Sequence, residues 1–169
     1  MSVFRHLTTV LVGAAASTAL LVVPAAAASP SASAEPGVAS VQKTVVELTN
    51  AERAKVGCPA LKIRPALHKA AQRHSADMAK HDFVGHTGSG GSTMVSRVEA
   101  AGYTGWSSLA ENVAADQATA KGVVKGWMRS PGHRANILNC SLRHIGVGHV
   151  KKSGAGQGDY WTQDFGAKL

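Results

Sequence analysis

Three side chains that could bind a ligand or move a proton stand in distinctive local sequences: His86, Glu111 and His133. His133 follows a Ser-Pro-Gly break within the stretch from Trp127 to Asn139, so its imidazole is expected on a loop held by rigid neighbours. The alternative is that the break only ends a helix, with His133 as part of a capping pair. His86 lies in a Gly/Ser-rich loop, and Glu111 lies among apolar residues. Because an unpaired buried carboxylate is costly, Glu111 is either exposed at an edge or held by a partner.

A serine nucleophile is a second chemical possibility. Ser130 lies three residues before His133, and two further serines, Ser107 and Ser108, precede Glu111. A Ser/His/Glu set can be drawn from these residues. No G-x-S-x-G elbow accompanies them, however, and a serine before Pro-Gly is more typical of a helix end. Nucleophilic hydrolysis is therefore not the preferred interpretation.

The composition predicts one globular domain with a basic surface. The chain has 169 residues and a formal net charge of +8. Such a charge favours attraction to anionic surfaces, including wall polymers, lipid headgroups and nucleic acid. The Lys and Arg residues are scattered without a tight run, and no nucleic-acid-binding motif accompanies them, so no nucleic-acid partner is expected.

The N-terminal residues are typical of a secretory signal peptide. Arg5 provides a positive start, an apolar stretch from Leu7 to Val23 follows, and small residues end it near Ala28. We therefore expect a signal peptide over 1–28, with a retained membrane anchor as the alternative, and no membrane span in the mature chain. Residues 29–40 are rich in Ser, Ala and Pro and are expected to be a disordered lead-in to a domain over 41–169.

The two cysteines of the exported chain, Cys58 and Cys140, are expected to form one disulfide. Metal ligation by the pair is disfavoured because no C-x-x-C spacing is present. Closing a loop of this length stabilises a fold by about 4 kcal/mol in the chain-entropy model. The bridge would tie the end of the His133 stretch to the end of the first predicted helix.

Apolar spacing predicts helices in the first half of the chain and short strands near its end. The last two strands are expected to form an antiparallel hairpin, which gives an α+β fold with helices packed on a small antiparallel sheet. The three histidines of the second helix (His68, His74 and His81) are interpreted as surface or core-edge residues. The predicted helices cover 41–56, 65–80, 93–101 and 118–129, and the predicted strands cover 109–114, 145–150 and 160–165.

Several motifs in a fixed order carry a family resemblance. They are T-N-A-E-R, G-H-T, A-E-N-V-A, W-M-R-S-P-G-H-R-A-N-I-L, I-G-V-G and Y-W-T-Q-D-F-G. Together they resemble the CAP superfamily of cysteine-rich secretory proteins, antigen 5 and pathogenesis-related class 1 proteins, and most of all its bacterial secreted SCP-domain branch. The resemblance spans about Val41 to Phe165. It implies an α-β-α sandwich in which helices cover both faces of a small antiparallel sheet.

The resemblance also implies a central cleft lined by two histidines and two acids. His86 and His133 match the histidines, and Glu111 matches the first acid. Ser130 stands where animal and fungal members carry the second acid, so the set is incomplete. Two further polar positions around the implied cleft are matched by Asn112 and Gln163.

Two neutral imidazoles in such a cleft could ligate Zn²⁺ or another divalent metal, with water completing the shell. Glu111 would then orient an imidazole or act as a base on a bound water. The alternative is a hydrogen-bonded network of His86, Glu111 and His133 that only fixes the loops.

We expect a secreted, non-enzymatic binding module, extracellular or wall-associated and monomeric. Its ligand would be a small amphipathic, lipid-like or peptide molecule, with or without a metal. One alternative is a metal-dependent hydrolase acting on peptides or cell-envelope material. A second alternative is a protein whose basic surface binds an anionic envelope polymer.

Overall fold

The structure is a computed structural model that describes residues 36–153 and 158–169, with side chains from residue 41 onward. The predicted signal peptide and residues 29–35 of the predicted lead-in lie outside these residues. The first helix begins at Pro36, so it includes the last part of the segment predicted to be disordered. Within the described residues, no helix is both long and apolar enough to cross a membrane.

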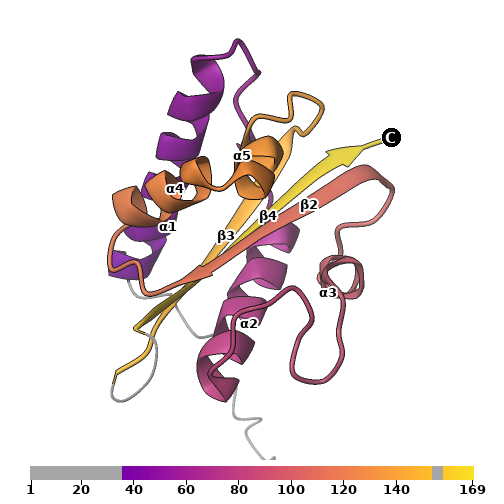
Figure 1. Ribbon diagram of the computed structural model, residues 1–169. Helices are drawn as coiled ribbons and strands as arrows, with labels where there is room; N and C mark the ends of the chain where they lie inside the picture. Colours follow the sequence, from indigo (N-terminus) through magenta and orange to yellow (C-terminus); the bar gives the residue numbers. More distant parts are fainter. Residues whose placement is uncertain (1–35, 154–157) are drawn as a thin grey trace, which may run out of the picture. The chain divides into compact units, whose positions relative to one another are not determined.

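Five helices and four strands make up the described chain (Figure 1). Most boundaries fall within a few residues of those that the apolar spacing predicts. The helices are α1 (Pro36–Ala54), α2 (Pro65–His81), α3 (Met94–Ala100), α4 (Ala120–Arg129) and α5 (Pro131–Ile137), and the strands are β1 (Lys62–Ile63), β2 (Trp106–Ala115), β3 (His144–Lys151) and β4 (Asp159–Lys168).

The sheet has the order β1-β3-β4-β2, which leaves β2 at one edge. Strands β3 and β4 form the predicted antiparallel hairpin, with Ile145 opposite Phe165. Strand β2 is also antiparallel to β4, with Glu111 opposite Asp164. The small antiparallel sheet is confirmed for its three long strands, and the two-residue β1 adds one short parallel pairing with β3 at the other edge.

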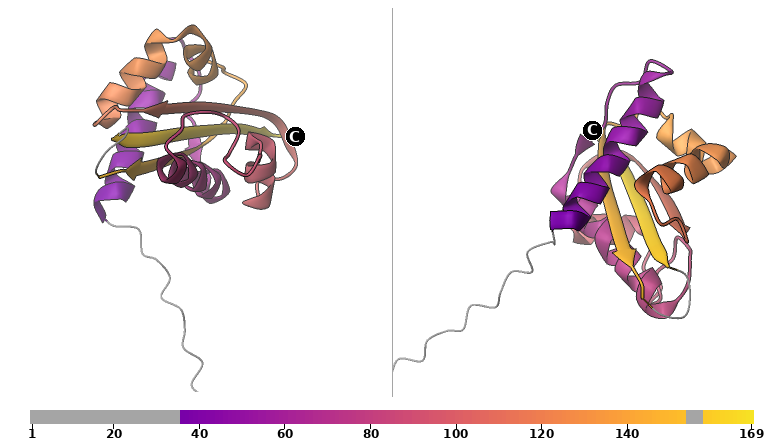
Figure 2. Two further views of the ribbon diagram at one scale, coloured as in Figure 1. Left: turned by 60° about the horizontal axis from the view of Figure 1, so that its bottom comes forward. Right: turned by 90° about the vertical axis from the view of Figure 1, so that its left-hand side faces the viewer.

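Helices cover both faces of the sheet, which confirms the α-β-α arrangement. Figure 2 shows α4 and α5 on one side of the strands and α2 and α3 on the other. On the first side, Val45 of α1, Trp127 of α4 and Ile137 of α5 pack in one buried cluster with sheet residues. On the second side, Leu67 and Met78 of α2 are fully buried in two smaller clusters.

Two glycines of β3 allow α2 to approach the sheet closely. A Cβ atom at Gly146 would lie 2.1 Å from the backbone nitrogen of His68, and one at Gly148 would lie 2.2 Å from the carbonyl oxygen of Ala71. Neither distance is compatible with a real side chain, so the I-G-V-G motif is a packing requirement of the α2–β3 contact.

The prediction that His133 lies on a loop was wrong, because Pro131 begins helix α5. Proline is favoured in the first turn of a helix, where its missing N–H would have no partner anyway. The Ser-Pro-Gly break therefore ends α4 and starts α5 at once, with Ser130 between them. His133 lies in the first turn of this short helix.

Two devices fix the chain after α5. The Cys58–Cys140 disulfide joins it to the segment after α1, as predicted. Beside this bridge, the fully buried Arg53 donates hydrogen bonds to the carbonyl oxygens of Ile137 at 2.7 Å and Leu142 at 3.0 Å. The end of α1 therefore holds α5 in place, and with it His133.

Candidate functional site

The candidate site lies at the free edge of β2, where the two helical layers meet. Two carbonyl groups of this edge strand receive hydrogen bonds from the helices beside it. Asn136 of α5 donates to the carbonyl oxygen of Glu111 at 3.2 Å, and the Trp127 indole of α4 donates to that of Val113 at 3.2 Å. These contacts cover an edge that would otherwise be open to another strand. They also hold α5 against Glu111.

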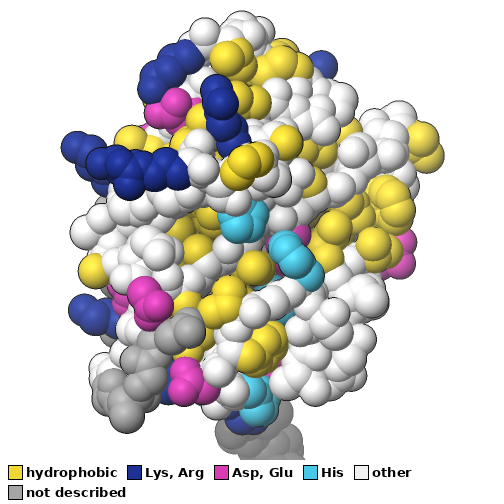
Figure 3. Space-filling model, in the orientation of Figure 1, with side chains coloured by type: hydrophobic (Ala, Val, Ile, Leu, Met, Phe, Trp, Pro, Cys, Tyr) yellow, Lys and Arg dark blue, Asp and Glu magenta, His cyan; other side chains and the backbone are white. Residues whose placement is uncertain are grey.

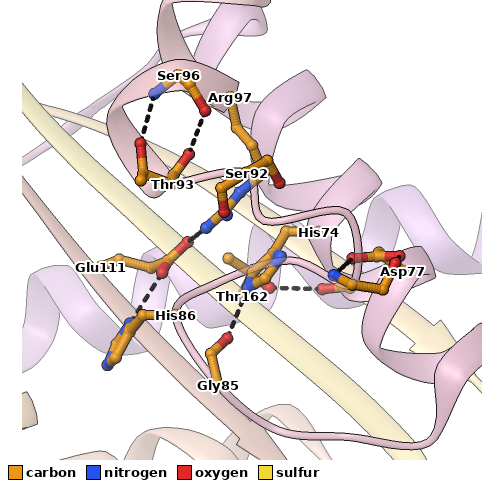
Figure 4. A network of polar contacts seen from close by, with 12 residues as sticks. His74, Asp77, Gly85, His86, Ser92, Thr93, Ser96, Arg97, Glu111 and Thr162 are labelled. Carbon is orange, nitrogen blue, oxygen red and sulfur yellow. Dashed lines mark hydrogen bonds and ion pairs between the residues drawn. The ribbon is translucent and has the colours of Figure 1, made fainter.

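Glu111 is the centre of the site, and its side chain is only 2% exposed. His86 Nδ1 lies 2.8 Å from its Oε1 atom, and an Arg97 guanidinium nitrogen lies 2.6 Å from its Oε2 atom (Figure 4). The acid is therefore held by partners inside, which is one of the two situations that its apolar flanks predicted. Because a carboxylate only accepts hydrogen bonds, His86 Nδ1 carries a proton and donates it to Glu111, and Nε2 lies outside this bond.

The loop that carries His86 is pinned to α2 on both sides of the histidine. His74 Nε2 donates to the carbonyl oxygen of Gly85 at 2.7 Å. Asp77 accepts from the backbone N–H of Ser89 at 2.8 Å and from its hydroxyl at 2.6 Å. In Figure 4 the His86 ring points away from His74 and Asp77. The His86 side chain remains 59% exposed, so it is rigidly placed and still accessible.

His133 comes to the same place from the other helical layer. It is half-buried, and its backbone carbonyl oxygen accepts from the Asn112 amide at 3.2 Å. Burial, followed by the positive charge that His86 would carry, lowers the pKa of His133. The imidazole is thereby kept neutral at physiological pH. In Figure 3, histidine side chains gather near the middle of one face, with apolar side chains around them. We call His86, Glu111 and His133 the histidine site.

Asn112 and Gln163 lie behind this site rather than on its surface. Both are fully buried, and the Asn112 amide donates to Gln163 Oε1 at 3.1 Å. Gln163 in turn donates to the hydroxyl of Thr49 on α1 at 2.8 Å. Among the described residues, no hydrogen bond joins the Ser130 side chain to the histidine site. The structure therefore brings His86 and Glu111 into contact and places His133 beside them, with Asn112 and Gln163 as their support.

Asp164 is a second acid at the site that the sequence did not single out. It lies opposite Glu111 in the β2–β4 ladder and is fully buried. Among the described residues no donor reaches its carboxyl oxygens, so its hydrogen bond with the neighbouring Glu111 carboxylate requires that Asp164 carry the proton. Burial, reinforced by the negative charge of Glu111, raises the pKa of Asp164 well above its usual value. The protonated form of Asp164 is therefore favoured relative to an exposed aspartic acid.

Four other residues that hold the site also went unrecognised: His74, Asp77, Arg97 and Asn136. For His74 a signal was present, because it falls in phase with Leu67, Ala70, Ala71 and Met78 on the buried side of α2. A polar residue at a buried helix position must find a partner. Arg97, Asp77 and Asn136 gave no such signal, since each occupies an ordinary polar position on its helix.

The histidine site offers few ligands to a metal ion. Among the described residues, no group of three or more His, Cys, Asp and Glu side chains is arranged to hold one. His86 Nε2 and the neutral imidazole of His133 are available donors, and Glu111 stands behind His86 as the acceptor that metal-bound histidines commonly have. Two imidazoles do not make a closed structural site, which takes four protein ligands.

Comparison with known proteins gives the family. Residues 46–165 match the CAP family, described as the Cysteine-rich secretory protein family. The chain is 41% identical over 133 residues to the uncharacterised protein YkwD of Bacillus subtilis, covering 79% of this chain and 49% of YkwD. It is 31% identical over 124 residues to the uncharacterised membrane protein YlbC of the same organism, covering 73% of this chain and 34% of YlbC. The chain thus spans half or less of the length of these relatives.

Solved structures agree with this match. An extracellular protein of Bacillus anthracis that contains an SCP domain superposes with a TM-score of 0.70 at 26% identity, covering 82% of this chain and 45% of that protein. An outer surface protein of Borrelia burgdorferi shares the fold with a TM-score of 0.69 at 22% identity, covering 77% and 94% of the two chains. With the family match, the sandwich fold and the predicted disulfide all in agreement, the chain belongs to the CAP, or cysteine-rich secretory protein, family.

Proposed function

We propose that this chain is a secreted, non-enzymatic binding module whose histidine site holds a small amphipathic, lipid-like or peptide ligand, with or without a divalent metal. The observation that carries the proposal is the state of His86. Glu111 fixes its Nδ1 atom, while the side chain remains 59% exposed and offers Nε2 to a ligand. His133 adds a second neutral imidazole beside it. One pre-positioned imidazole with a second beside it, at an accessible edge, suits a polar group of a ligand or a metal ion.

The surroundings of Glu111 favour binding over catalysis. A general base must come within hydrogen-bonding distance of the proton that it removes. Both Glu111 oxygens are already occupied by His86 and Arg97, and the side chain is 2% exposed. Asp164 is fully buried. Neither acid can reach a substrate or a water at the surface in this arrangement, so the site lacks an accessible carboxylate for hydrolysis.

Three observations support an extracellular location. The first 28 residues have the composition of a signal peptide, and the Cys58–Cys140 disulfide suits an oxidising compartment. The structurally similar proteins of Bacillus anthracis and Borrelia burgdorferi are described as extracellular and outer-surface proteins. We therefore place the binding module outside the cell.

The test is calorimetric titration of Zn²⁺ into the parent chain and its histidine variants. His86→Ala and His133→Ala should each weaken binding by at least about tenfold, because each removes one of only two imidazole ligands. His68→Ala is the matched control, since this histidine of α2 donates to the carbonyl oxygen of Val147 on β3 and touches none of the residues that hold the site, so it should leave binding unchanged. Equal Zn²⁺ binding by the parent and both site variants would exclude the histidine site as the metal site.

A second measurement separates binding from catalysis. The parent should bind a long-chain fatty acid or a short apolar peptide, and the two site variants should bind the same probe less tightly. None of the three proteins should hydrolyse peptide or cell-envelope substrates. Turnover that both a chelator and Glu111→Gln abolish would overturn the non-enzymatic assignment and support the metal-dependent hydrolase.

A further inference from the structure

The chain has a long segment without any acidic residue. Between Asp116 and Asp159 there is no Asp or Glu, whereas seven Lys and Arg residues occur. In the sequence the first four of these Lys and Arg residues are spread out, because three or four other residues separate each from the next. The segment contains α4 and α5, so these helices carry positive charge only.

The fold gathers four of these cations on one surface. Lys121, Lys125 and Arg129 follow one another at four-residue intervals along α4, about 6 Å apart per step, and Arg134 continues the row on α5. All four side chains are exposed. Figure 3 shows Lys and Arg side chains at the upper left, where Figure 1 draws α1 and α4. We call these four residues the basic row.

The basic row is not neutralised by nearby acids. Among the described residues, none of its members takes part in an ion pair. The acids of the neighbouring α1 already have partners, since Glu47 pairs with Lys43 at 3.7 Å and Glu52 with Lys55 at 2.6 Å. The row therefore presents uncompensated charge to the solvent.

Two apolar hollows accompany the row. One, of about 360 Å³, lies between α1 and α4, with Leu48 and Val124 among its lining residues and Lys121 and Lys125 at its side. Glu52 also lines this hollow, and its carboxylate is paired with Lys55. The other, also of about 360 Å³, lies between α4 and α5 and is lined by Leu138 and Arg134, among others. Met128 and Arg129 line both hollows, so the two are neighbours along the row. The basic row therefore runs beside two neighbouring apolar hollows.

We propose that the surface of α4 and α5 docks a linear polyanion in which phosphodiester groups are separated by short carbon linkers. The phosphates would lie against the Lys and Arg side chains, with Arg able to bind two oxygens at once. The carbon linkers would cover the two hollows. A bilayer fits less well, because membrane-surface helices insert protruding apolar side chains. The strongly exposed large apolar residues of the described chain are Val56, Ile63, Val84 and Leu169, and none lies on α4 or α5.

The test measures binding of poly(glycerol phosphate) to the whole chain at several salt concentrations. Lys121→Gln/Lys125→Gln/Arg129→Gln should weaken binding at least about tenfold and lower the slope of log K against log salt by about 2, as expected for three lost phosphate contacts. The matched control is Lys69→Gln/Arg73→Gln/Lys80→Gln on α2. It removes the same number of Lys and Arg from equally exposed positions on the other face of the sheet, and binding should change less than about twofold.

Equal weakening by both triple variants would show that binding follows net charge alone and would overturn the proposal. Unchanged binding by the α4 variant would also overturn the proposal.

Binding to vesicles of phosphatidylglycerol is measured in parallel, to distinguish the polymer from a membrane. If the parent binds vesicles but not the polymer at the same salt, and the α4 variant loses the vesicles, the surface docks a membrane instead. Met128→Gln in the parent should weaken polymer binding by about twofold to fivefold if the hollows hold the linkers.

Discussion

Two polar clusters lie back to back on β2 and β4, one on each face of the sheet. On the face of α1 and α5, Asn112 and Gln163 are neutral amides whose hydrogen bonds run from Thr49 to Asn136. On the face of α2 lie two acids, Glu111 and Asp164, which are opposite each other in the β2–β4 ladder. Each is the sequence neighbour of one of the amides. The amide cluster is complete, whereas the acid cluster leaves a nitrogen of His74 and the Arg97 Nε atom without partners among the described residues.

This difference indicates that the amide cluster supports the fold, whereas the acid cluster belongs to the candidate site. A fully satisfied neutral network rigidifies a core and has nothing further to offer a ligand. The acid cluster carries ionisable groups in a low-dielectric setting, and its exposed end is His86. Its buried atoms without hydrogen-bond partners lower the stability of the fold, and native proteins retain such atoms mainly where a functional site requires them. We therefore expect mutations of the two clusters to differ in their dependence on pH as well as in size.

The largest effect is expected from removal of Arg97. Arg97→Met leaves Glu111 buried with His86 as its remaining partner, and breaking a buried pair in this way costs roughly 4 kcal/mol of unfolding free energy. Urea denaturation would measure the loss. Arg73→Met is the control, because Arg73 is exposed and makes no ion pair among the described residues, so it should cost below about 0.5 kcal/mol. Equal losses would mean that Glu111 does not depend on Arg97.

On the amide face, Asn112→Ala should cost roughly 3 kcal/mol, because it leaves Gln163 Oε1 and the carbonyl oxygen of His133 without their donor. The same denaturation assay should give this loss unchanged between pH 4 and pH 8, since no group of the cluster ionises there. Asn139→Ala removes an exposed amide whose partners lie in the same turn, and it should cost below about 1 kcal/mol. A strong pH dependence of the Asn112 variant would contradict the assignment of this face as neutral support.

The effect of Asp164→Asn on the free energy of unfolding is expected to depend on pH. The folded-state pKa of Asp164 is raised, so the folded protein keeps a proton that the unfolded chain releases above pH 3.8. The stability that this proton contributes is fully present below pH 3.8 and is lost as pH rises toward the folded pKa. Asn cannot ionise, so the variant should gain on the parent by about 1.4 kcal/mol per pH unit in that range. A constant difference from pH 3 to pH 7 would show that folded Asp164 ionises normally.

The sequence was sufficient for the elements with strong local signals. Pro65, the apolar phase of α2 and the Gly-rich turn before β4 placed helices and hairpin strands where they are observed. The disulfide followed from the cysteine count together with the predicted export of the chain. Helix α5 was missed because Ser-Pro-Gly both ends a helix and begins one, and β1 was missed because two residues carry no periodicity.

The site was only half accessible from the sequence. His86, Glu111 and His133 were selected by type and by family resemblance, but their partners depend on register and layer. Asp164 becomes significant only because β2 and β4 pair with Glu111 opposite it. Arg97 becomes significant only because α3 packs on the same side as that pair. Neither relation is encoded in a window of neighbouring residues.

The smallest effect is expected from a neutral pair on the acid face. The Ser75 hydroxyl donates to Thr162 Oγ1 at 2.9 Å, and both residues are fully buried. Ser75→Ala leaves the Thr162 hydroxyl unsatisfied and should cost about 1 kcal/mol, whereas Ser75→Ala/Thr162→Val removes both polar groups and should cost less than the single change. Denaturation at pH 4 and pH 8 should give the same values. If this pair shows the pH dependence expected of Asp164, then the α2 face as a whole, rather than its acids, sets the response to pH.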